Sequence, residues 1–274
     1  MTRLQASNVT FAYNKEPIIE NLNMTIPEGE ITVLIGSNGC GKSTLLKMLA
    51  RLLFPSKGGV YLNDNEMLSL PAKAVAKELA VLPQSAVSPE GLTVRQLVKQ
   101  GRYPYQSWLK QWSKEDEEMV EYALAATGLT DLRDRPLNAL SGGQRQRTWI
   151  AMTLTQGTKT LLLDEPTTYL DLTHQVDVLD LLFELNEKEQ RTIVMVLHDI
   201  NLACRYAHNI VAVKDKRIYA QGRPEEIITV NTLKEVFQMD CEIIYDPIFG
   251  SPLCVPHGRG RAVSNHMSPK TPHI

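Results

Sequence analysis

The chain has 274 residues, 43% of them hydrophobic, which is enough to bury a large core. Its 29 Lys and Arg residues are balanced by 31 Asp and Glu residues, and the formal net charge of −2 argues against a nucleic-acid backbone as the main partner. No uninterrupted apolar run approaches the roughly 18 residues of a membrane-spanning helix, and the four cysteines show neither metal-ligand spacing nor a dense disulfide framework. We therefore expect a reduced, cytosolic setting and a peripheral role at any membrane.

The N-terminal part of the chain predicts strands that lead into a glycine-rich loop. Residues 4–26 alternate apolar and polar, and a turn at 27–30 precedes the apolar strand 31–35. The sequence GSNGCGKST follows directly and meets the template G-x-x-x-x-G-K-[ST]. A strand, a glycine-rich turn and a helix in this order hold nucleotide phosphates. A purely structural glycine turn is the alternative.

The residue types in this loop suit phosphate binding. Glycines let backbone N–H groups approach the phosphates, and the following helix points its positive end at them. Lys42 adds a point charge for the outer phosphates, and the Ser43 hydroxyl suits Mg²⁺. The predicted nucleotide contacts are Gly36, Ser37, Asn38, Gly39, Cys40, Gly41, Lys42, Ser43 and Thr44. Cys40 is an unusual residue here, but its backbone N–H should serve whatever its side chain.

After the loop, strands and helices alternate around a helical insert. Apolar residues at helical spacing predict a helix that Pro55 ends, and short strands follow at 59–62 and 79–82. From 93 to 156 the sequence becomes rich in charge and Gln, which indicates a helical subdomain inserted into a sheet protein. Further elements are predicted at 160–163, 175–188, 192–197 and 210–213. The near-continuous apolar strands indicate a largely parallel sheet covered on both faces.

The C-terminal end differs in composition from the rest. Residues 241–255 predict a last hairpin around Phe249-Gly250-Ser251. Residues 257–274 contain Gly, Pro, Ser, His and Arg with few apolar anchors, so they are predicted to be disordered.

Two acidic residues end the apolar strand at 160–163. Asp164, at the strand tip, is placed to hold the hydration shell of Mg²⁺ near the loop lysine. Glu165 can polarise a water for in-line attack on the terminal phosphate. An ordinary acidic strand end before a proline turn is the alternative, which a phosphate loop in the same chain disfavours.

The string Leu140-Ser141-Gly142-Gly143-Gln144 is the most specific signal in the sequence. Ser141 and Gln144 have the spacing of a capping box, so a helix is predicted to begin here. A capped helix start with two glycines exposes N–H groups and forms a second anion-binding site. Because one nucleotide does not need two such sites from one chain, a head-to-tail dimer that uses both is favoured.

With these motifs in this order, the chain resembles the ATP-binding subunits of ATP-binding cassette transporters over roughly residues 4–255. The resemblance implies an α/β fold, a P-loop nucleotide hydrolase core with an antiparallel β subdomain and an inserted α-helical subdomain. It also implies one ATPase domain at 1–256. Its expected parts are a core at about 1–92 and 157–240, a helical subdomain at about 93–156 and a hairpin at about 241–256.

The remaining site residues follow from that resemblance. Tyr13 matches the aromatic residue that stacks on adenine, with a core strand aromatic as the alternative. Gln84 matches the glutamine that reaches metal and attacking water and senses the membrane partner. Asp171 matches the loop that crosses the dimer interface, and it also fits a helix N-cap. His198 matches the histidine that contacts the terminal phosphate, and it joins Glu165, Gln84 and Lys42 as the expected catalytic set.

The resemblance also implies cofactors and partners. ATP and Mg²⁺ would bind between two copies of the chain, and hydrolysis would release them. Two integral membrane permease subunits and a periplasmic or lipid-anchored substrate-binding protein would complete the complex. The chain would work at the cytoplasmic face of the bacterial inner membrane, with no nucleic acid partner.

The substrate class is predicted from two segments. Gly101-Arg102-Tyr103-Pro104, which fits either a surface turn or a permease-docking face, and the stretch 165–175 resemble the importer branch for ferric siderophores, haem and cobalamin. Within that branch we expect a ferric siderophore, with cobalamin or haem as alternatives. Other classes are a soluble cassette protein acting on ribosomes or DNA, which usually has two cassettes or a coiled coil, and a regulatory module that binds nucleotide without hydrolysing it.

Overall fold

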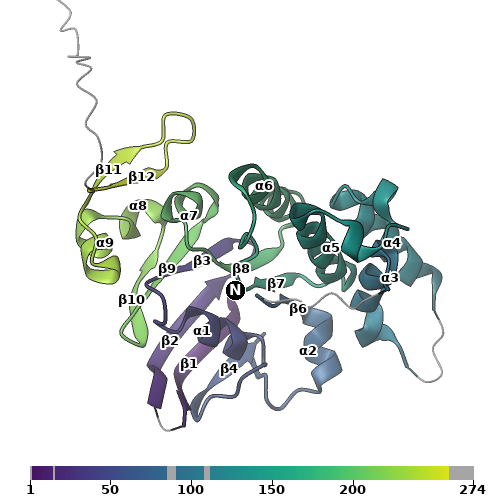
Figure 1. Cartoon of the computed structure of the whole chain (residues 1–274). Coiled ribbons are helices and arrows are strands. Elements are labelled where there is room, and N and C mark those ends of the chain that lie inside the picture. Colours follow the sequence, from purple (N-terminus) through teal and green to yellow (C-terminus); the bar gives the residue numbers. More distant parts are fainter. Residues whose placement is uncertain (1, 15, 85–90, 108–111, 259–274) are drawn as a thin grey trace, which may run out of the picture.

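A computed structural model describes residues 2–14, 16–84, 91–107 and 112–258. Within these ranges the chain forms a six-stranded, a four-stranded and a two-stranded sheet with helices around them (Figure 1). The predicted disordered segment 257–274 falls outside the described residues from 259 onward.

The six-stranded sheet is the centre of the fold and has the order β10-β9-β3-β8-β7-β6. Its strands are β3 (Ile31–Ile35), β6 (Leu79–Leu82), β7 (Thr160–Leu163), β8 (Thr192–Val196), β9 (Asn209–Lys214) and β10 (Arg217–Gly222). All neighbours are parallel except β10, which runs antiparallel to β9. The predicted parallel sheet is confirmed. The edge strand β10 was not predicted, although its sequence alternates between exposed and half-buried positions.

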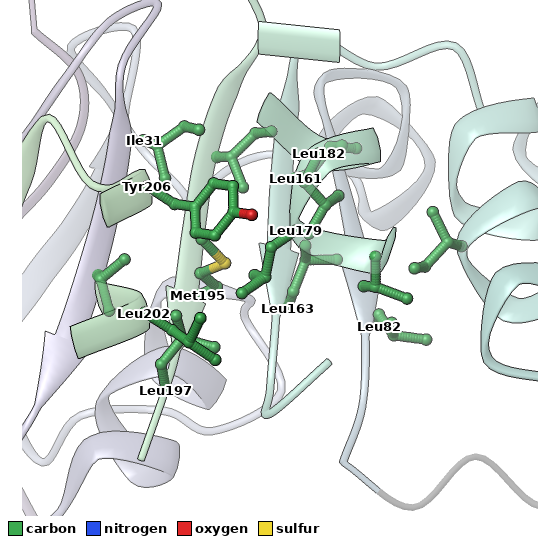
Figure 2. Packing of buried hydrophobic residues seen from close by; sticks show 14 of the residues in the cluster. Ile31, Leu82, Leu161, Leu163, Leu179, Leu182, Met195, Leu197, Leu202 and Tyr206 are labelled. Carbon is green, nitrogen blue, oxygen red and sulfur yellow. The ribbon is translucent and has the colours of Figure 1, made fainter. Parts of the chain in front are cut away.

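The two faces of this sheet are covered by different layers because side chains alternate along each strand. Leu161 and Leu163 of β7 belong to one buried cluster, whereas Leu162 belongs to the other. Figure 2 shows the first cluster, in which Leu179 and Leu182 pack near Leu161 and Met195. The expected coverage of both faces is therefore confirmed.

The four-stranded sheet has the order β2-β1-β4-β5, and together with α1 it contributes to the second cluster. Its strands are β1 (Thr2–Tyr13), β2 (Glu16–Pro27), β4 (Lys57–Leu62) and β5 (Asn65–Glu66), and the helix is α1 (Lys42–Leu49). The prediction that this helix extends to Pro55 is wrong. It ends at Leu49 because Arg51 adopts a left-handed φ of 57°.

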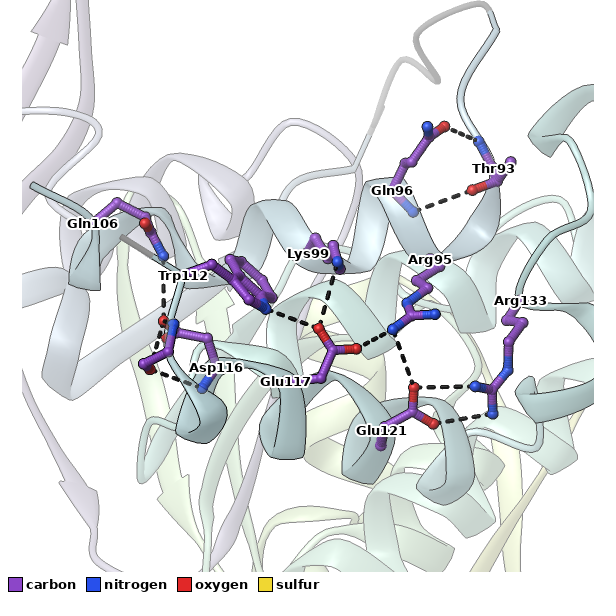
Figure 3. Close-up of polar contacts among 11 residues, drawn as sticks. Thr93, Arg95, Gln96, Lys99, Gln106, Trp112, Asp116, Glu117, Glu121 and Arg133 are labelled. Atoms are coloured by element: carbon purple, nitrogen blue, oxygen red, sulfur yellow. Dashed lines mark hydrogen bonds and ion pairs between the residues drawn. The ribbon is translucent and has the colours of Figure 1, made fainter. Parts of the chain in front are cut away.

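The region from 94 to 155 contains helices, as its composition predicts. Its elements are α3 (Val94–Lys99), η1 (Gln100–Tyr105), α4 (Lys114–Ala126), η2 (Thr130–Leu132), η3 (Leu137–Ala139) and α5 (Gly142–Thr155). Many of the charges join these elements, since Glu117 of α4 binds Arg95 and Lys99 of α3, and Glu121 binds Arg133 (Figure 3). The surface-turn interpretation of residues 101–104 is wrong for its first half, because Gly101 and Arg102 are buried in η1.

Several short helices escaped sequence analysis. These are α2 (Ala72–Glu78), α7 (Ile200–Tyr206), α8 (Pro224–Ile227) and α9 (Val230–Phe237). The long helix α6 (Leu172–Glu189) begins before the predicted start at 175 because Asp171 caps it. The last strands, β11 (Cys241–Tyr245) and β12 (Pro252–Pro256), pair antiparallel around the turn that includes Phe249 and Gly250. Across the described ranges, no helix combines the length and the apolar character that a membrane span requires.

Candidate nucleotide-binding site

The phosphate loop, the acidic strand end and His198 meet at the carboxyl ends of the parallel strands. The loop follows β3, the acids follow β7 and His198 follows β8, and these three strands are neighbours in the sheet. They enclose a cavity of about 300 Å³ lined by Ile18, Asn38, Gly39, Gly41, Lys42, Ser43, Thr44, Glu165 and His198. Ligands of open α/β sheets bind at this edge, so the fold places the predicted phosphate site where such sites occur.

Backbone geometry explains two of the loop glycines. Gly36 has φ 148°, and a Cβ there would lie 2.3 Å from the carbonyl oxygen of Val213. Gly41 has φ 106°, and a Cβ there would lie 2.8 Å from Ile19 Cδ1. Any side chain at either position would displace the loop, because L-residues disfavour these φ values and the space is filled. Gly36 and Gly41 therefore fix the backbone path of the loop, and α1 begins at Lys42.

Lys42 is buried and pins the loop from within. Its Nζ donates to the carbonyl oxygens of Gly36 and Ser37, both at 2.9 Å. The thiol of Cys40 lies 3.8 Å from the same Nζ and does not line the cavity. The lysine charge therefore lies in the wall of the cavity, where it can meet phosphate oxygens.

Asp164 is the residue best placed for a divalent cation. Ser43 Oγ donates to Asp164 Oδ1 at 2.8 Å, while Oδ2 is buried and has no hydrogen-bond partner among the described residues. Burial raises the pKa of Asp164, the hydrogen bond from Ser43 opposing it. An orphaned carboxylate oxygen beside a hydroxyl is an oxygen-donor set that Mg²⁺ prefers. The residues present therefore fit the metal.

Glu165 is held in a strained backbone conformation that fixes its carboxylate. It has φ 54°, rare for a residue with a side chain. His198 Nε2 lies 2.8 Å from Oε1, and Thr168 Oγ1 donates to Oε2 at 2.9 Å. Burial raises the pKa of Glu165, but hydrogen bonds from His198, Thr168 and Gln84 outweigh it and hold the pKa below its usual range. The side chain is therefore an ionised hydrogen-bond acceptor, and Thr168 is a contact that sequence reasoning missed.

The LSGGQ segment forms the predicted capping box at the start of α5. Gln144 N donates to Ser141 Oγ at 3.2 Å, and Ser141 N donates to Gln144 Oε1 at 3.1 Å. Gly142 lines a second cavity of about 300 Å³, which shares Glu165 with the first cavity but not the phosphate loop. Gln84 lines this second cavity and not the first. None of the LSGGQ residues lines the first cavity. One chain therefore does not bring its two predicted anion sites together.

Tyr13 and Asp171 lie outside the phosphate cavity as well. Tyr13 is 49% exposed at the end of β1 and packs edge-on against Phe11, with ring centroids 4.8 Å apart. It is therefore not a core aromatic. Asp171 is the N-cap of α6 and accepts a hydrogen bond from His174 N at 3.0 Å, which confirms the N-cap interpretation.

Comparison with known proteins places the chain in a class. Residues 19–168 match the family described as ABC transporter. The chain belongs to the ABC transporter family, and within that family it is an ATPase. This confirms the fold class and the activity that the motifs predicted.

Similar proteins are known from several bacteria. The chain is 66% identical to the probable siderophore transport system ATP-binding protein YusV of Bacillus subtilis, covering 96% of each chain. It is 63% identical to the petrobactin import ATP-binding protein FpuD of Bacillus anthracis, covering 97% of each. It is 48% identical to the ferric enterobactin transport ATP-binding protein FepC of Escherichia coli, covering 94% of this chain and 96% of FepC.

Solved structures share the fold over most of the chain. An ABC transporter in an inward-facing conformation matches with a TM-score of 0.82 and 28% identity, covering 94% of this chain and 99% of that one. The dimeric bacterial cassette MJ0796 matches with a TM-score of 0.70 and 29% identity, covering 80% and 98%.

Proposed function

We propose that this protein hydrolyses ATP to energise import of a ferric siderophore through a separate membrane permease. The observation that carries the proposal is the full-length similarity, at 66% and 63% identity, to proteins named for siderophore transport and petrobactin import. The phosphate loop, the acidic strand end and His198, which share one cavity, support hydrolysis. The formal net charge of −2 disfavours the alternative in which a soluble cassette acts on ribosomes or DNA.

The residues in and around the cavity divide the chemistry among them. The loop N–H groups and Lys42 bind the phosphates, and Tyr13 stacks on the adenine. Ser43, Asp164 and Gln84 would hold Mg²⁺, which neutralises phosphate charge when bound. Glu165, kept ionised by its neighbours, orients the attacking water and accepts its proton. His198, already in contact with Glu165, faces the terminal phosphate.

A second copy of the chain would complete each site. The LSGGQ segment is separate from the phosphate cavity of its own chain, so the segment of a partner copy can close over the nucleotide. Next to Asp171, the side chains of Tyr169 and Leu172 are 95% and 68% exposed. Apolar exposure of this kind marks an interaction surface, and the similar cassette MJ0796 is dimeric.

A permease subunit would dock on a different face. A groove of about 450 Å³ lies between the end of α1 and α2, lined by residues that include Leu52, Phe54, Val75 and Leu79. Leu52 and Phe54 are 55% and 58% exposed, and this apolar lining suits a short apolar permease helix. The chain would then lie at the cytoplasmic face of the membrane. A substrate-binding protein would deliver the cargo to the permease.

The dimer is tested with Glu165→Gln, which keeps the shape of the site but removes the base. We expect this variant to bind ATP and to accumulate a dimer on a sizing column, with Lys42→Ala as the control that stays monomeric. A Glu165→Gln protein that remains a monomer at saturating ATP would contradict the shared site.

The substrate is tested by uptake of labelled Fe³⁺ chelates in cells that lack the protein. We expect uptake to stop and to return with the wild-type chain or Cys40→Ser, but not with Glu165→Gln. Normal iron uptake with impaired cobalamin import would move the proposal to the cobalamin branch.

A further inference from the structure

His174, a residue with no role in the preceding mechanism, joins Asp171 to the start of α6. The backbone N–H of His174 donates to Asp171 Oδ1 at 3.0 Å, and its ring Nδ1 lies 2.7 Å from the same oxygen. The two bonds lower the pKa of Asp171, the backbone bond contributing most. The carboxylate of Asp171 is therefore held by the side chain of His174 as well as by the helix.

The other side of the His174 ring packs on the LSGGQ segment. A Cβ added to Gly143 would lie 2.2 Å from His174 Cδ2 and 2.9 Å from Cγ, closer than real Cβ contacts allow. Leu170 makes a looser contact, since a Cβ on Gly142 would lie 3.9 Å from its Cδ2. Gly143 is therefore glycine partly because the imidazole of its own chain fills the space of a side chain.

We propose that His174 is a positioning residue that sets the distance between Asp171 and the LSGGQ glycines. Both elements are the ones expected to face the partner copy, so a ring fixed between them presents them as a single rigid surface. The proposal rests on the shared ATP site described above. It assigns His174 no contact with nucleotide, because His174 does not line the phosphate cavity.

A purely structural role for the side chain makes a different prediction. The N-cap of α6 uses the backbone N–H of residue 174, which every non-proline substitution keeps. Thr173, in the same turn, is exposed and offers a matched control. Loss of helix stability alone would lower the amount of folded protein without changing the concentration at which folded copies associate.

The experiment measures ATP-driven dimerisation in the Glu165→Gln background by analytical ultracentrifugation. We expect His174→Ala to raise the dimer dissociation constant about tenfold, because the Asp171 carboxylate loses its side-chain partner and the glycines lose the ring that packs on them. His174→Phe keeps a ring against Gly143 and His174→Gln keeps a donor for Asp171, so each should fall between Ala and His. The dimer dissociation constant of Thr173→Ala should match that of the parent within twofold. At protein concentrations too low for dimerisation, the ATP affinity of every variant should be unchanged.

Steady-state ATP hydrolysis, measured in variants that keep the wild-type Glu165, gives a second readout. We expect His174→Ala to raise the ATP concentration for half-maximal hydrolysis more than it lowers kcat. A higher protein concentration should restore both values toward those of the wild type. A fall in kcat that protein concentration does not restore would overturn the proposal.

Gly143 tests the ring contact directly. Gly143→Ala must move the imidazole, whereas the methyl group has space once His174 is Ala. We expect Gly143→Ala to weaken dimerisation less in the His174→Ala background than alone, and additive losses would contradict the packing argument.

The possible failures are distinguishable. If Glu165→Gln alone does not dimerise, the shared site is wrong. If it dimerises and His174→Ala dimerises equally well, or Thr173→Ala loses as much, only the role of His174 is refuted.

Discussion

Asp116→Asn would remove one charge from a buried ion pair that fixes η1 to the helices beside it. Arg102 Nε donates to Asp116 Oδ1 at 2.7 Å, and the two side chains are 2% and 1% exposed. Arg102 also donates to the carbonyl oxygen of Thr155 at 3.2 Å, at the end of α5. The variant keeps the shape of Asp116 but leaves the guanidinium without its buried partner.

The cost can be estimated in two ways. Burial raises the pKa of Asp116, but hydrogen bonds from Ser113 and Arg102 outweigh it and lower the pKa from 3.8 to about 2, which corresponds to about 2.5 kcal/mol in favour of the folded state. Breaking a buried ion pair costs about 3–5 kcal/mol. Glu115, 68% exposed and 3.4 Å from Arg102, remains as a weaker counter-ion. We therefore expect a loss of about 2–4 kcal/mol.

Urea unfolding at neutral pH measures this loss. Glu118→Gln is the control, because Glu118 pairs with Lys114 at 3.4 Å on the exposed face of the same helix and should change stability by less than about 0.5 kcal/mol. Since the folded pKa of Asp116 is lowered, its contribution is present above 3.8 and is lost as the pH falls toward 2. The gap between wild type and variant should narrow over that range. Equal stability at neutral pH would refute the estimate.

Three further outcomes concern the nucleotide site. Lys42→Ala should abolish ATP binding in an equilibrium assay, whereas Cys40→Ser should leave it within about twofold because the thiol does not line the cavity. Gly41→Ala should weaken ATP binding by about tenfold or more, since φ 106° and Ile19 oppose a side chain there, and unchanged affinity would show that the loop adapts. His198→Ala removes the largest contact that lowers the pKa of Glu165, so the acid limb of the kcat profile should move to higher pH, and an unmoved limb would show that Glu165 is not the titrating base.

The features predictable from sequence are those whose partners lie a few residues apart. The capping box of Ser141 and Gln144 and the N-cap Asp171 follow from spacing alone, and their hydrogen bonds are present. The parallel sheet was equally predictable, because strands buried on both faces read as continuous apolar runs. The acidic strand end indicates catalysis only when it lies near a phosphate loop, and the strand order of the sheet brings the two to the same edge.

The features that escaped prediction depend on contacts between distant segments or on short elements. Arg102 lies in a segment for which a surface turn was one of two interpretations, yet Asp116 and Thr155 make its burial possible. Thr168 is an ordinary residue until the left-handed turn at Glu165 brings its hydroxyl to the carboxylate. The packing of His174 on Gly143 joins segments that no local pattern relates. The helices α2, α7 and α8 are too short for apolar periodicity to stand out.

The helix α5 connects two surfaces that the proposals assign to different partners. Its N-terminus presents the LSGGQ glycines to a second copy, and its C-terminal end holds η1 through Arg102 and Thr155. A Cβ on Gly101 would lie 2.1 Å from the carbonyl oxygen of Met152, so η1 packs directly on this helix. With 14 residues α5 spans about 21 Å without an internal break. Because Gln156, the next residue, lines the proposed permease groove, a shift of the LSGGQ end toward a partner's nucleotide must also move that wall of the groove.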